Sequence, residues 1–241
     1  ASLRTDLGYN TADNAPGHWE PVHWHGTAVA GSAAAIGNNA LGVAGVSLGS
    51  EIVPVRVTNL LSGSAYISDM ADCINYGANV GSDVINLSYQ TYSGGAIFST
   101  IIAAANYADS LGSVVVIAAG NENSNPAPNQ DPASIVYVAA TTSTNGKASF
   151  SNYGNYVDIA APGESITTTY ATVNCSDANR NGLADPGECG VSSNGYASVS
   201  GTSFASPITA GGVLLVRSVD PTLSAAATRS ILFQSATDLG T

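Results

Sequence analysis

The sequence is poor in charge and in long apolar runs. Charged residues make up 10% of its 241 residues, against roughly 25% in an average soluble domain. Only six of them are Lys or Arg, against 17 Asp or Glu, so the net charge is −11. Nucleic acids and anionic membrane surfaces are bound through clustered cations, and this balance therefore excludes both as expected partners. No apolar run reaches the roughly 20 residues that a membrane-spanning helix needs.

Cysteine is also scarce, with three residues in the chain. Cys175 and Cys189 flank one loop, and a disulfide between them would require an oxidising compartment. Cys73 lies in a helix-like segment with apolar neighbours, which favours a buried thiol, and its pairing stays open. The segment 1–10 lacks the apolar core of a signal peptide. We therefore expect a secreted, extracellular protein from which the signal has been removed.

Short β-branched runs alternate with longer helical patterns along the chain. The runs are apolar on both sides, as in parallel strands that are covered on both faces. Serial strand–helix alternation predicts an α/β fold, a doubly wound and mostly parallel sheet with helices on both faces in a three-layer sandwich. We expect one domain over residues 1–241. The expected strands are 52–57, 83–89, 113–120 and 134–141, and the expected helices are 64–79, 95–112, 201–219 and 222–235.

The pattern becomes irregular between residues 164 and 200, where Ser, Asn and Gly dominate. We expect no regular strand or helix there. In doubly wound sheets the functional site lies beyond the carboxyl ends of the strands. The residues that follow the expected strands are therefore the candidates for a site.

Ser203 lies in "GTSFASP", just before a helical run, with Pro207 in the first turn where its missing N–H does no harm. Backbone N–H groups and the positive end of the helix dipole would favour an oxyanion beside this serine. A simple helix N-cap explains the same serine equally well. Asn121 follows an expected strand, where its amide could donate to an oxyanion or merely form a turn.

His25 begins a run of small residues that reads as a helix with Gly37 as its stop. A lone histidine is more often structural than catalytic. His18 and His23 lie nearby, but no supporting arrangement of carboxylates is evident for a three-histidine metal site. A catalytic base, a metal ligand and a structural residue are all compatible with this position taken alone.

Three motifs together resemble the subtilisin-like serine proteases. "HGTAVAG" at 25–31 resembles the family's histidine motif, "AAGN" at 118–121 its oxyanion-asparagine motif and "GTSFASP" at 201–207 its serine motif. "DVINLSY", "ASFSNYG" and "APG" are lesser matches in the family's order. The family has histidines where Ala28 and Ile208 stand, and often a methionine at Phe204, and none of these changes should prevent the chemistry.

The resemblance implies a serine endopeptidase that hydrolyses peptide bonds through an acyl-enzyme. It implies that Ser203 is the nucleophile, that His25 is the general base and acid, and that Asn121 donates to the oxyanion together with the backbone N–H of Ser203. A protein or peptide substrate would pair as an added strand with the cleft. The residues expected to line this cleft are Ser88, Tyr89, Ala118 and Gly120.

The resemblance also indicates where the primary specificity pocket would lie. Gln130 and Asp131 fall where the floor of this pocket is expected, and an acid there could favour Lys or Arg before the cleaved bond. A broad apolar preference is the main expectation.

The family's catalytic aspartate stands in an Asp-Ser/Thr-Gly motif upstream of the histidine, and this sequence has no such motif. Asp6 and Asp13 resemble later segments and are poor candidates for the acid. We expect the chain to be incomplete at both ends and a companion segment to supply the carboxylate. Residues 1–241 alone should be nearly inactive. The alternative is a catalytically silent subtilisin-like fragment or pseudoprotease that binds peptides or serves a structural role.

Residues 174–190 hold an inserted loop that follows the spacing of a calcium-binding loop. Its oxygen-bearing residues and one central glycine fall where Ca²⁺ ligands and a sharp turn are needed, although helical flanks are absent. We expect a structural Ca²⁺ here and no organic cofactor, and a plain acidic surface loop is the alternative. The expected ligands are Asp177, Asn179, Asn181, Leu183 through its carbonyl, Asp185 and Glu188, with Cys175 and Cys189 closing the loop.

Overall fold

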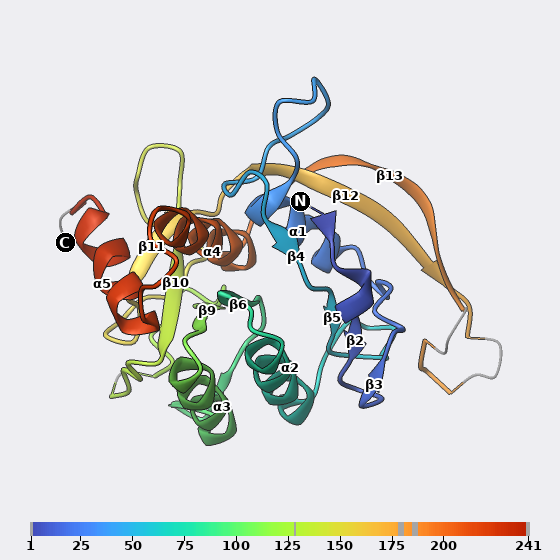
Figure 1. Ribbon diagram of the computed structural model, residues 1–241, viewed down its shortest axis with the longest axis horizontal. Helices are drawn as coiled ribbons and strands as arrows, with labels where there is room; N and C mark the ends of the chain where they lie inside the picture. The colour runs from blue at the N-terminus through green and yellow to red at the C-terminus, as the bar shows by residue number, and fades with distance from the viewer. Residues whose placement is uncertain (1, 128, 178–180, 185–187, 240–241) are drawn as a thin grey trace.

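The computed structural model describes residues 2–127, 129–177, 181–184 and 188–239 (Figure 1). A four-stranded parallel sheet with the order β11-β10-β9-β6 forms its centre. Its strands are β6 (Val84–Leu87), β9 (Val114–Ala118), β10 (Ile135–Thr141) and β11 (Ile159–Pro162). Three of the four predicted strand runs therefore lie in this sheet, with bounds that differ by at most two residues.

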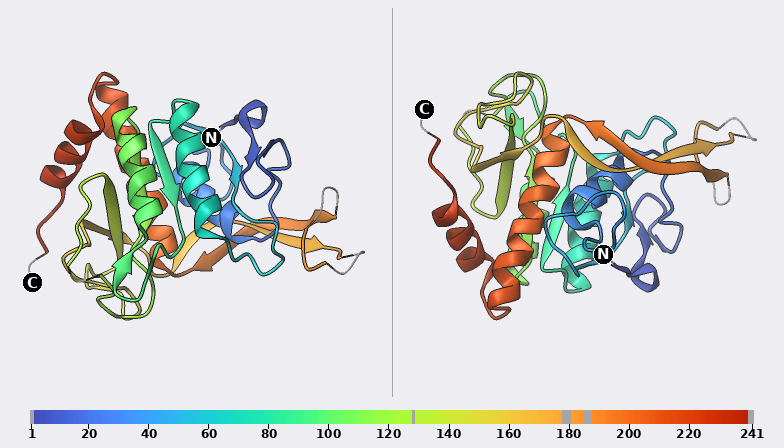
Figure 2. Two further views of the ribbon diagram at one scale, coloured as in Figure 1. Left: turned by 90° about the horizontal axis from the view of Figure 1, so that it is seen from below. Right: turned by 90° about the horizontal axis from the view of Figure 1, so that it is seen from above.

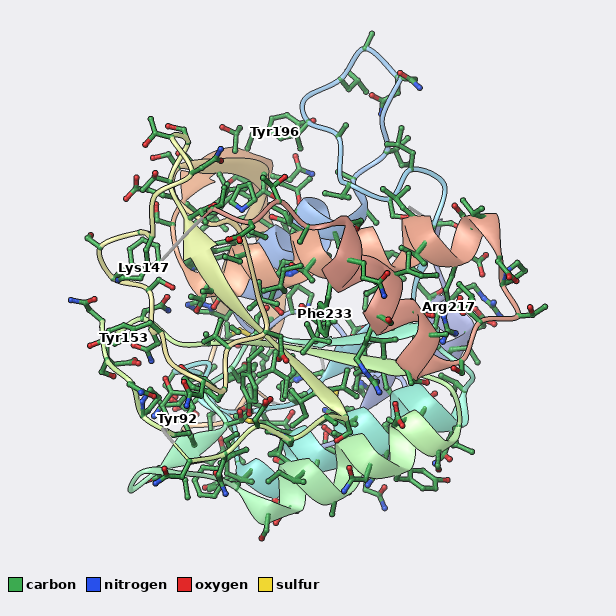
Figure 3. The ribbon with its side chains drawn as sticks, turned by 90° about the vertical axis from the view of Figure 1, so that its left-hand side faces the viewer. Tyr92, Lys147, Tyr153, Tyr196, Arg217 and Phe233 are labelled. Atoms are coloured by element: carbon green, nitrogen blue, oxygen red, sulfur yellow. A yellow bond between two sulfur atoms is a disulfide. The ribbon has the colours of Figure 1, made fainter. Side chains whose placement is uncertain are left out.

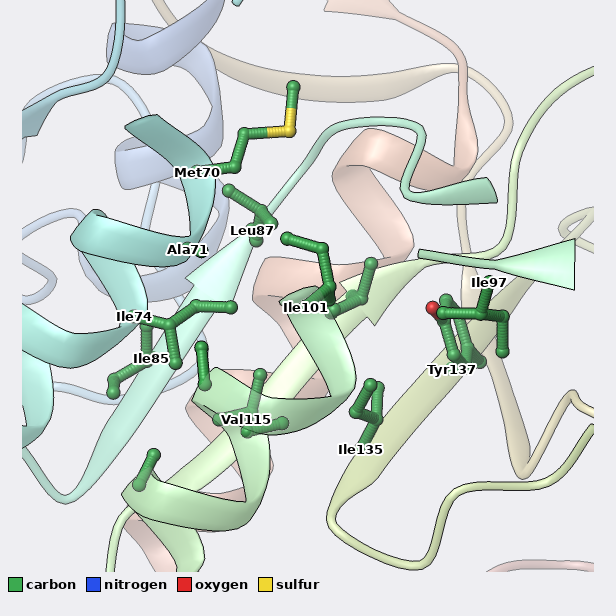
Figure 4. Close-up of a cluster of buried hydrophobic side chains, with 14 of the residues drawn as sticks. Met70, Ala71, Ile74, Ile85, Leu87, Ile97, Ile101, Val115, Ile135 and Tyr137 are labelled. Atoms are coloured by element: carbon green, nitrogen blue, oxygen red, sulfur yellow. The ribbon is translucent and has the colours of Figure 1, made fainter. Parts of the chain in front are cut away.

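Helices cover both faces of the sheet, as predicted. In Figure 1, α2 (Ile67–Asn79) and α3 (Ser99–Ser110) lie below it, α4 (Thr202–Val219) lies above it, and α5 (Ala225–Ser235) lies at the left and shares a core with α4. Side chains of β9 alternate between the two layers. Val115 and Ile117 pack with Ile74 and Ile101 in one core (Figure 4), while Val114 and Val116 pack with Val213 in the other. The structure thus confirms the α/β fold class.

The predicted strand 52–57 is divided into β4 (Glu51–Ile52) and β5 (Val55–Arg56). Pro54 lies between the two, and a proline has no N–H for a strand ladder. The two short strands belong to separate small sheets. In one, β4 pairs with β1 (Ser2–Leu3), and in the other, β5 pairs with β2 (Tyr9–Asn10). The remaining short elements are a 3₁₀ turn (Thr5–Leu7), β3 (Ala15–Pro16), β7 (Tyr92–Ser93) and β8 (Ala96–Ile97).

The helix α1 (His25–Ala34) ends before Gly37, the predicted stop. The following loop ends it, because Gly45 N donates to Ala35 O at 2.9 Å and Ser47 N donates to Ala33 O at 2.9 Å. A Cβ on Gly45 would lie 2.3 Å from the backbone nitrogen of Ala34, so only glycine permits this close approach. The small residues of α1 thus allow the chain to fold back tightly against the helix end.

The expectation of irregular structure between 164 and 200 is wrong. This stretch forms a long antiparallel hairpin of β12 (Ile166–Cys175) and β13 (Cys189–Val199), visible in Figure 1 and from above in Figure 2. β12 packs on α1, where the hydroxyls of Thr168 and Thr169 each donate to a helix carbonyl at 2.8 Å. Two threonine hydroxyls thus join this strand to α1, and its two buried positions are Thr168 and the apolar Ala171.

Candidate active site

Ser203 is the second residue of α4, at the end of the helix where backbone N–H groups have no partner inside the helix. Its side chain is half-buried. The segment that follows β6 lies directly against it. The Ser88 hydroxyl donates to Ser203 O at 2.9 Å, and the Ser203 hydroxyl lies 3.5 Å from Ser88 O. Ser203 therefore faces the carboxyl end of the sheet, as the doubly wound arrangement predicts.

Asn121 lies beside the same helix start. Its Oδ1 accepts a hydrogen bond from Thr202 N at 2.9 Å and another from the Thr202 hydroxyl at 3.0 Å, while Gly120 N donates to Thr202 Oγ1 at 3.0 Å. These contacts fix which end of the amide is oxygen. Asn121 is exposed, and no hydrogen bond within the described part of the chain occupies its Nδ2, so this amide nitrogen is left as a donor at the residue whose oxygen binds the start of α4.

His25 is the first residue of α1, and its ring is packed mainly by aromatic neighbours. Its centroid lies 5.6 Å from the ring of Phe204, the residue next to Ser203, and 5.6 Å from the ring of Trp24. Burial, and then the neighbouring His23, lower the pKa of His25 from 6.5 to about 4. Its ring forms no hydrogen bond with Ser203 or with a carboxylate among the described residues. His25 is thus neutral at pH 7 and able to accept a proton, but its protonated form has no stabilising partner.

A cavity of about 1400 Å³ extends from His25 between two strand edges. One side is lined by 51–58, which contains β4 and β5, and the other by 81–90, which contains β6. On the remaining sides, apolar residues of α1, α2 and α4 line it. β6 pairs with β9 on one edge, and its other edge faces the cavity. The space therefore has the surroundings of an interior strand position: sheet edges on two sides and helices above and below.

The predicted cleft residues differ in how closely they approach Ser203. Ser88 contacts Ser203, and Gly120 is joined to Thr202. Ala118 ends the buried strand β9, and Tyr89 donates its hydroxyl hydrogen to Gly63 O at 2.9 Å. The exposed Asp131 precedes β10, and no contact found in the described residues joins it to the Ser203 segment.

Two residues of the site were missed in the sequence. Thr202 holds Asn121 through its hydroxyl and its N–H, and Asn152 is fully buried behind the loop that bears Asn121. Asn152 lies in "ASFSNYG", where an asparagine two residues before a glycine looks like an ordinary turn residue. The motif itself was the available signal, but nothing in it showed burial.

The inserted loop closes the tip of the β12–β13 hairpin, and the predicted disulfide between Cys175 and Cys189 is confirmed. Asp177 Oδ2 accepts from Gly182 N at 3.1 Å, whereas Asp177 Oδ1 is buried without a hydrogen-bond partner among the described residues. Leu183 forms a β-bridge with Leu60. Asn179 and Asp185 lie outside the described residues. In the part of the chain that is described, no group of three His, Cys, Asp or Glu residues could hold a metal.

The outer end of the β12–β13 hairpin, which carries the inserted loop, lies away from Ser203. Figures 1 and 2 show the hairpin tip pointing away from α4, over the side of the molecule that carries β2 and β3. Arg56 and Asn59 hold the loop there, because the Arg56 guanidinium donates to Ala184 O at 2.6 Å and Ala184 N donates to Asn59 O at 2.7 Å. The loop is thus anchored to β5 rather than to the neighbourhood of Ser203.

None of the helices in the described ranges is long and apolar enough to cross a membrane. In solved structures, proteases from Pseudoalteromonas arctica superpose with a TM-score of 0.74 at 36% identity, covering 90% of this chain and 65% of theirs. A cold adapted subtilisin-like serine proteinase also superposes with a TM-score of 0.74. It is 30% identical, and the match covers 96% of this chain and 74% of the proteinase chain.

Curated proteins give the same grouping. An extracellular protease of Xanthomonas campestris pv. campestris is 43% identical over 88% of this chain and 36% of its own length. Thermitase of Thermoactinomyces vulgaris is 41% identical over 78% of this chain and 58% of its own length. The chain thus spans between about a third and three fifths of these relatives. The sequence profile described as "Subtilase family" matches residues 4–241. With the fold and the Ser203–Asn121 arrangement, this match shows that the chain belongs to the subtilase family.

Proposed function

We propose that the protein of which this chain is part is a serine endopeptidase with Ser203 as nucleophile, His25 as general base and acid, and Asn121 as oxyanion donor. The observation that carries this proposal is the double hydrogen bond from Thr202 to Asn121 Oδ1. Because these bonds occupy the amide oxygen, the amide nitrogen of Asn121 is left as the group that would donate to a negative oxygen formed during attack by Ser203. The relatives that the sequence matches are named proteases and proteinases.

In this mechanism His25 takes the hydroxyl proton of Ser203 as the oxygen attacks the substrate carbonyl carbon. The carbonyl oxygen becomes an oxyanion and accepts hydrogen bonds from Asn121 Nδ2 and Ser203 N. When the peptide bond breaks, His25 gives its proton to the leaving amine and an acyl-enzyme remains. Water then attacks the acyl group by the same route, which restores Ser203 and His25.

The acid that should orient His25 is proposed to come from a companion segment. The cavity beside His25 supports this, because an extended apolar segment could pair with the free edge of β6 and fill the space between the strand edges. A carboxylate at its end near His25 would stabilise the imidazolium and raise the pKa of His25 from about 4. Without it, residues 1–241 would be the nearly silent form.

Labelling by a fluorophosphonate probe tests the peptidase proposal. The gene product that contains these residues and the isolated 241-residue chain are each treated with the probe, and the modified peptide is mapped. We expect rapid modification of Ser203 in the former and little in the latter, with the Ser203→Ala variant as control. A gene product that stays unlabelled and cleaves no peptide would mean a silent subtilisin-like protein.

We further propose that the loop 177–188 binds a structural Ca²⁺. Support comes from the buried, unpartnered Oδ1 of Asp177 and from a donor set of carboxylate, amide and carbonyl oxygens, which Ca²⁺ prefers. Bound Ca²⁺ would stabilise the hairpin tip, and at a hundredfold excess over its Kd the gain is about 2.7 kcal/mol. Thermal unfolding with Ca²⁺ and with a chelator should differ in the wild type and agree in the Asp177→Asn variant.

Secretion and substrate preference complete the proposal. The Cys175–Cys189 disulfide, and a relative whose name is "Extracellular protease", support an extracellular location. We propose a broad apolar preference before the cleaved bond. The competing role of Asp131 predicts instead that peptides with Lys or Arg at that position are cleaved faster, and that Asp131→Asn removes the difference.

A further inference from the structure

Asn152 lies at the centre of a hydrogen-bond network behind the loop that bears Asn121. Its side chain is fully buried. Three acceptors lie within hydrogen-bond distance of Asn152 Nδ2 and share its two hydrogens: Tyr92 OH at 2.7 Å, Glu122 Oε2 at 2.7 Å and Ala119 O at 3.1 Å. All the partners of this nitrogen therefore belong to the loop or to the segment packed against it.

The oxygen and the backbone of Asn152 bind the same loop on both sides of Asn121. Oδ1 accepts from Glu122 N at 3.0 Å and from Ser124 N at 2.9 Å, and Asn152 N donates to Gly120 O at 3.0 Å. One buried side chain thus substitutes for the strand partners that the loop loses once β9 has ended. A buried polar group with all its partners satisfied gives a rigid, well-specified arrangement.

Tyr92 and Glu122 close the network toward Asn121. Because Asn152 Nδ2 can only donate, the Tyr92 hydroxyl accepts from it and donates its own hydrogen to Glu122 Oε2 at 2.9 Å. The same carboxylate oxygen accepts from Asn121 N at 3.1 Å. Gly120 lies against this group with φ +103°, and a Cβ there would come within 2.5 Å of Asn152 Nδ2. The backbone on both sides of Asn121 is therefore fixed by Asn152 and its partners.

The turn that carries Asn152 is itself tied to the loop. Lys147 Nζ donates to Asn123 Oδ1 at 2.8 Å and to Ser151 O at 3.1 Å, and it lies 5.4 Å from the centre of the Tyr153 ring. Figure 3 shows Tyr92, Lys147 and Tyr153 along one edge of the molecule. The network therefore spans the loop and two segments distant from it in sequence.

We propose that Asn152 is a positioning residue for the oxyanion donor. It fixes the backbone on both sides of Asn121, so that the Asn121 side chain keeps its bonds to Thr202 and presents Nδ2 beside Ser203. The proposal rests on the proposed peptidase function. Asn152 itself touches neither substrate nor Ser203, and its effect on turnover passes entirely through Asn121.

A double-mutant cycle between Asn152 and Asn121 tests this dependence in the gene product that contains the chain. Loss of the oxyanion asparagine costs roughly 10²–10³-fold in turnover in subtilisin itself. We expect Asn152→Ala to lower kcat by about 10-fold to 10²-fold with KM changed less than about threefold, because only transition-state binding is lost. In an Asn121→Ala background the same change should lower kcat less than about threefold. An equal loss of kcat in both backgrounds would overturn the proposal.

Amide hydrogen exchange provides a measurement that does not need activity. Exchange at Glu122 and Ser124, whose N–H groups bind Asn152, should be faster by about tenfold or more in Asn152→Ala. The matched control is Tyr137→Phe, which removes another buried hydrogen bond, to Thr91 Oγ1 at 2.7 Å, without touching this loop. It should leave the exchange at both amides unchanged.

Tyr92→Phe keeps the test open if Asn152→Ala fails to fold. It removes one hydroxyl of the network, and we expect a smaller change in the same direction in kcat and in exchange. A wild type without turnover would refute the peptidase function, while hydrogen exchange would still decide whether Asn152 holds the loop. Unchanged exchange at Glu122 and Ser124 in both variants would overturn the proposal.

Discussion

The two sides of the candidate site are held in very different ways. On the Ser203 side, hydrogen bonds from Thr202, Ser88 and the buried Asn152 network fix the proposed nucleophile and the loop that bears the proposed oxyanion donor. On the other side, aromatic rings pack the His25 imidazole, which has no hydrogen-bonding acid among the described residues and borders a large cavity. The comparison shows that the electrostatic half of the site is already organised, while the proton-transfer half is not.

The largest expected effect comes from completing the His25 side. In a serine protease that keeps its geometry but loses the function of its acid, turnover falls by about 10⁴. We therefore expect the gene product with its own carboxylate to exceed residues 1–241 by about this factor in kcat. The carboxylate should also raise the pKa of His25 from about 4, which moves the acid limb of the pH–rate profile upward.

Proton NMR titration of His25 in both forms checks this prediction. The predicted contrast is a low pKa in the isolated chain and a higher pKa in the complete one. Equal turnover in the two forms would mean that the cavity has no part in catalysis.

Removing the donor on the organised side should have the next largest effect. Asn121→Ala loses the side-chain donor, and turnover should fall by roughly 10²–10³, the range measured in subtilisin. Asn121→Asp is the matched variant, because it retains an oxygen for the bonds from Thr202 but replaces the amide donor with a charged acceptor. It should be at least as inactive as Asn121→Ala. An active Asn121→Asp variant would show that the oxyanion is stabilised elsewhere.

How far the sequence predicts this molecule depends on whether an element is specified by apolar pattern. β9 and α4 were predicted to within two residues, because long apolar runs and a motif fix them. The β12–β13 hairpin was missed, since it lacks a long apolar run and contacts α1 partly through threonine hydroxyls, whose residue type resembles loop composition. Its disulfide was foreseen from spacing alone.

The residues of the candidate site also differ in whether the sequence alone predicts them. Motifs locate Ser203, His25 and Asn121, whose chemistry depends on residue type. Asn152 was not predicted, because its role follows from complete burial and from partners at distant positions, neither of which a local pattern reveals. A buried asparagine and a turn asparagine look identical in sequence, and only the tertiary contacts distinguish them.

A smaller effect is expected on the free energy of unfolding, which should fall with pH because His25 has no acid partner among the described residues. Its pKa is about 4 in the folded chain against an ordinary value of 6.5, so below pH 6.5 the unfolded chain binds a proton that the folded chain does not. This contribution to stability is fully present above pH 6.5 and is lost as the pH falls toward 4. It amounts to at most about 3 kcal/mol.

Urea unfolding of residues 1–241 at several pH values measures this loss. His25→Gln should remove that part of the slope between pH 6.5 and 4, because glutamine does not titrate. A protein that carries the proposed companion carboxylate, which would raise the His25 pKa, should also lack this part of the slope. A variant whose stability falls with pH as steeply as that of the wild type would assign the acid sensitivity to other groups.

The smallest expected effect lies at the hairpin tip, away from both sides of the site. Replacing Cys175 and Cys189 together by serine removes a cross-link over a sequence separation of 14, which we expect to cost about 2 kcal/mol of unfolding free energy. Turnover should change less than about twofold, because α1 is held to β12 by the hydroxyls of Thr168 and Thr169, near the opposite end of the hairpin. Thermal unfolding and kcat measured on the same preparation separate the two effects. A large loss of turnover at unchanged stability would mean that the hairpin tip contributes to the site. The Ser203 side and the His25 side would then not be sufficient to describe the candidate site.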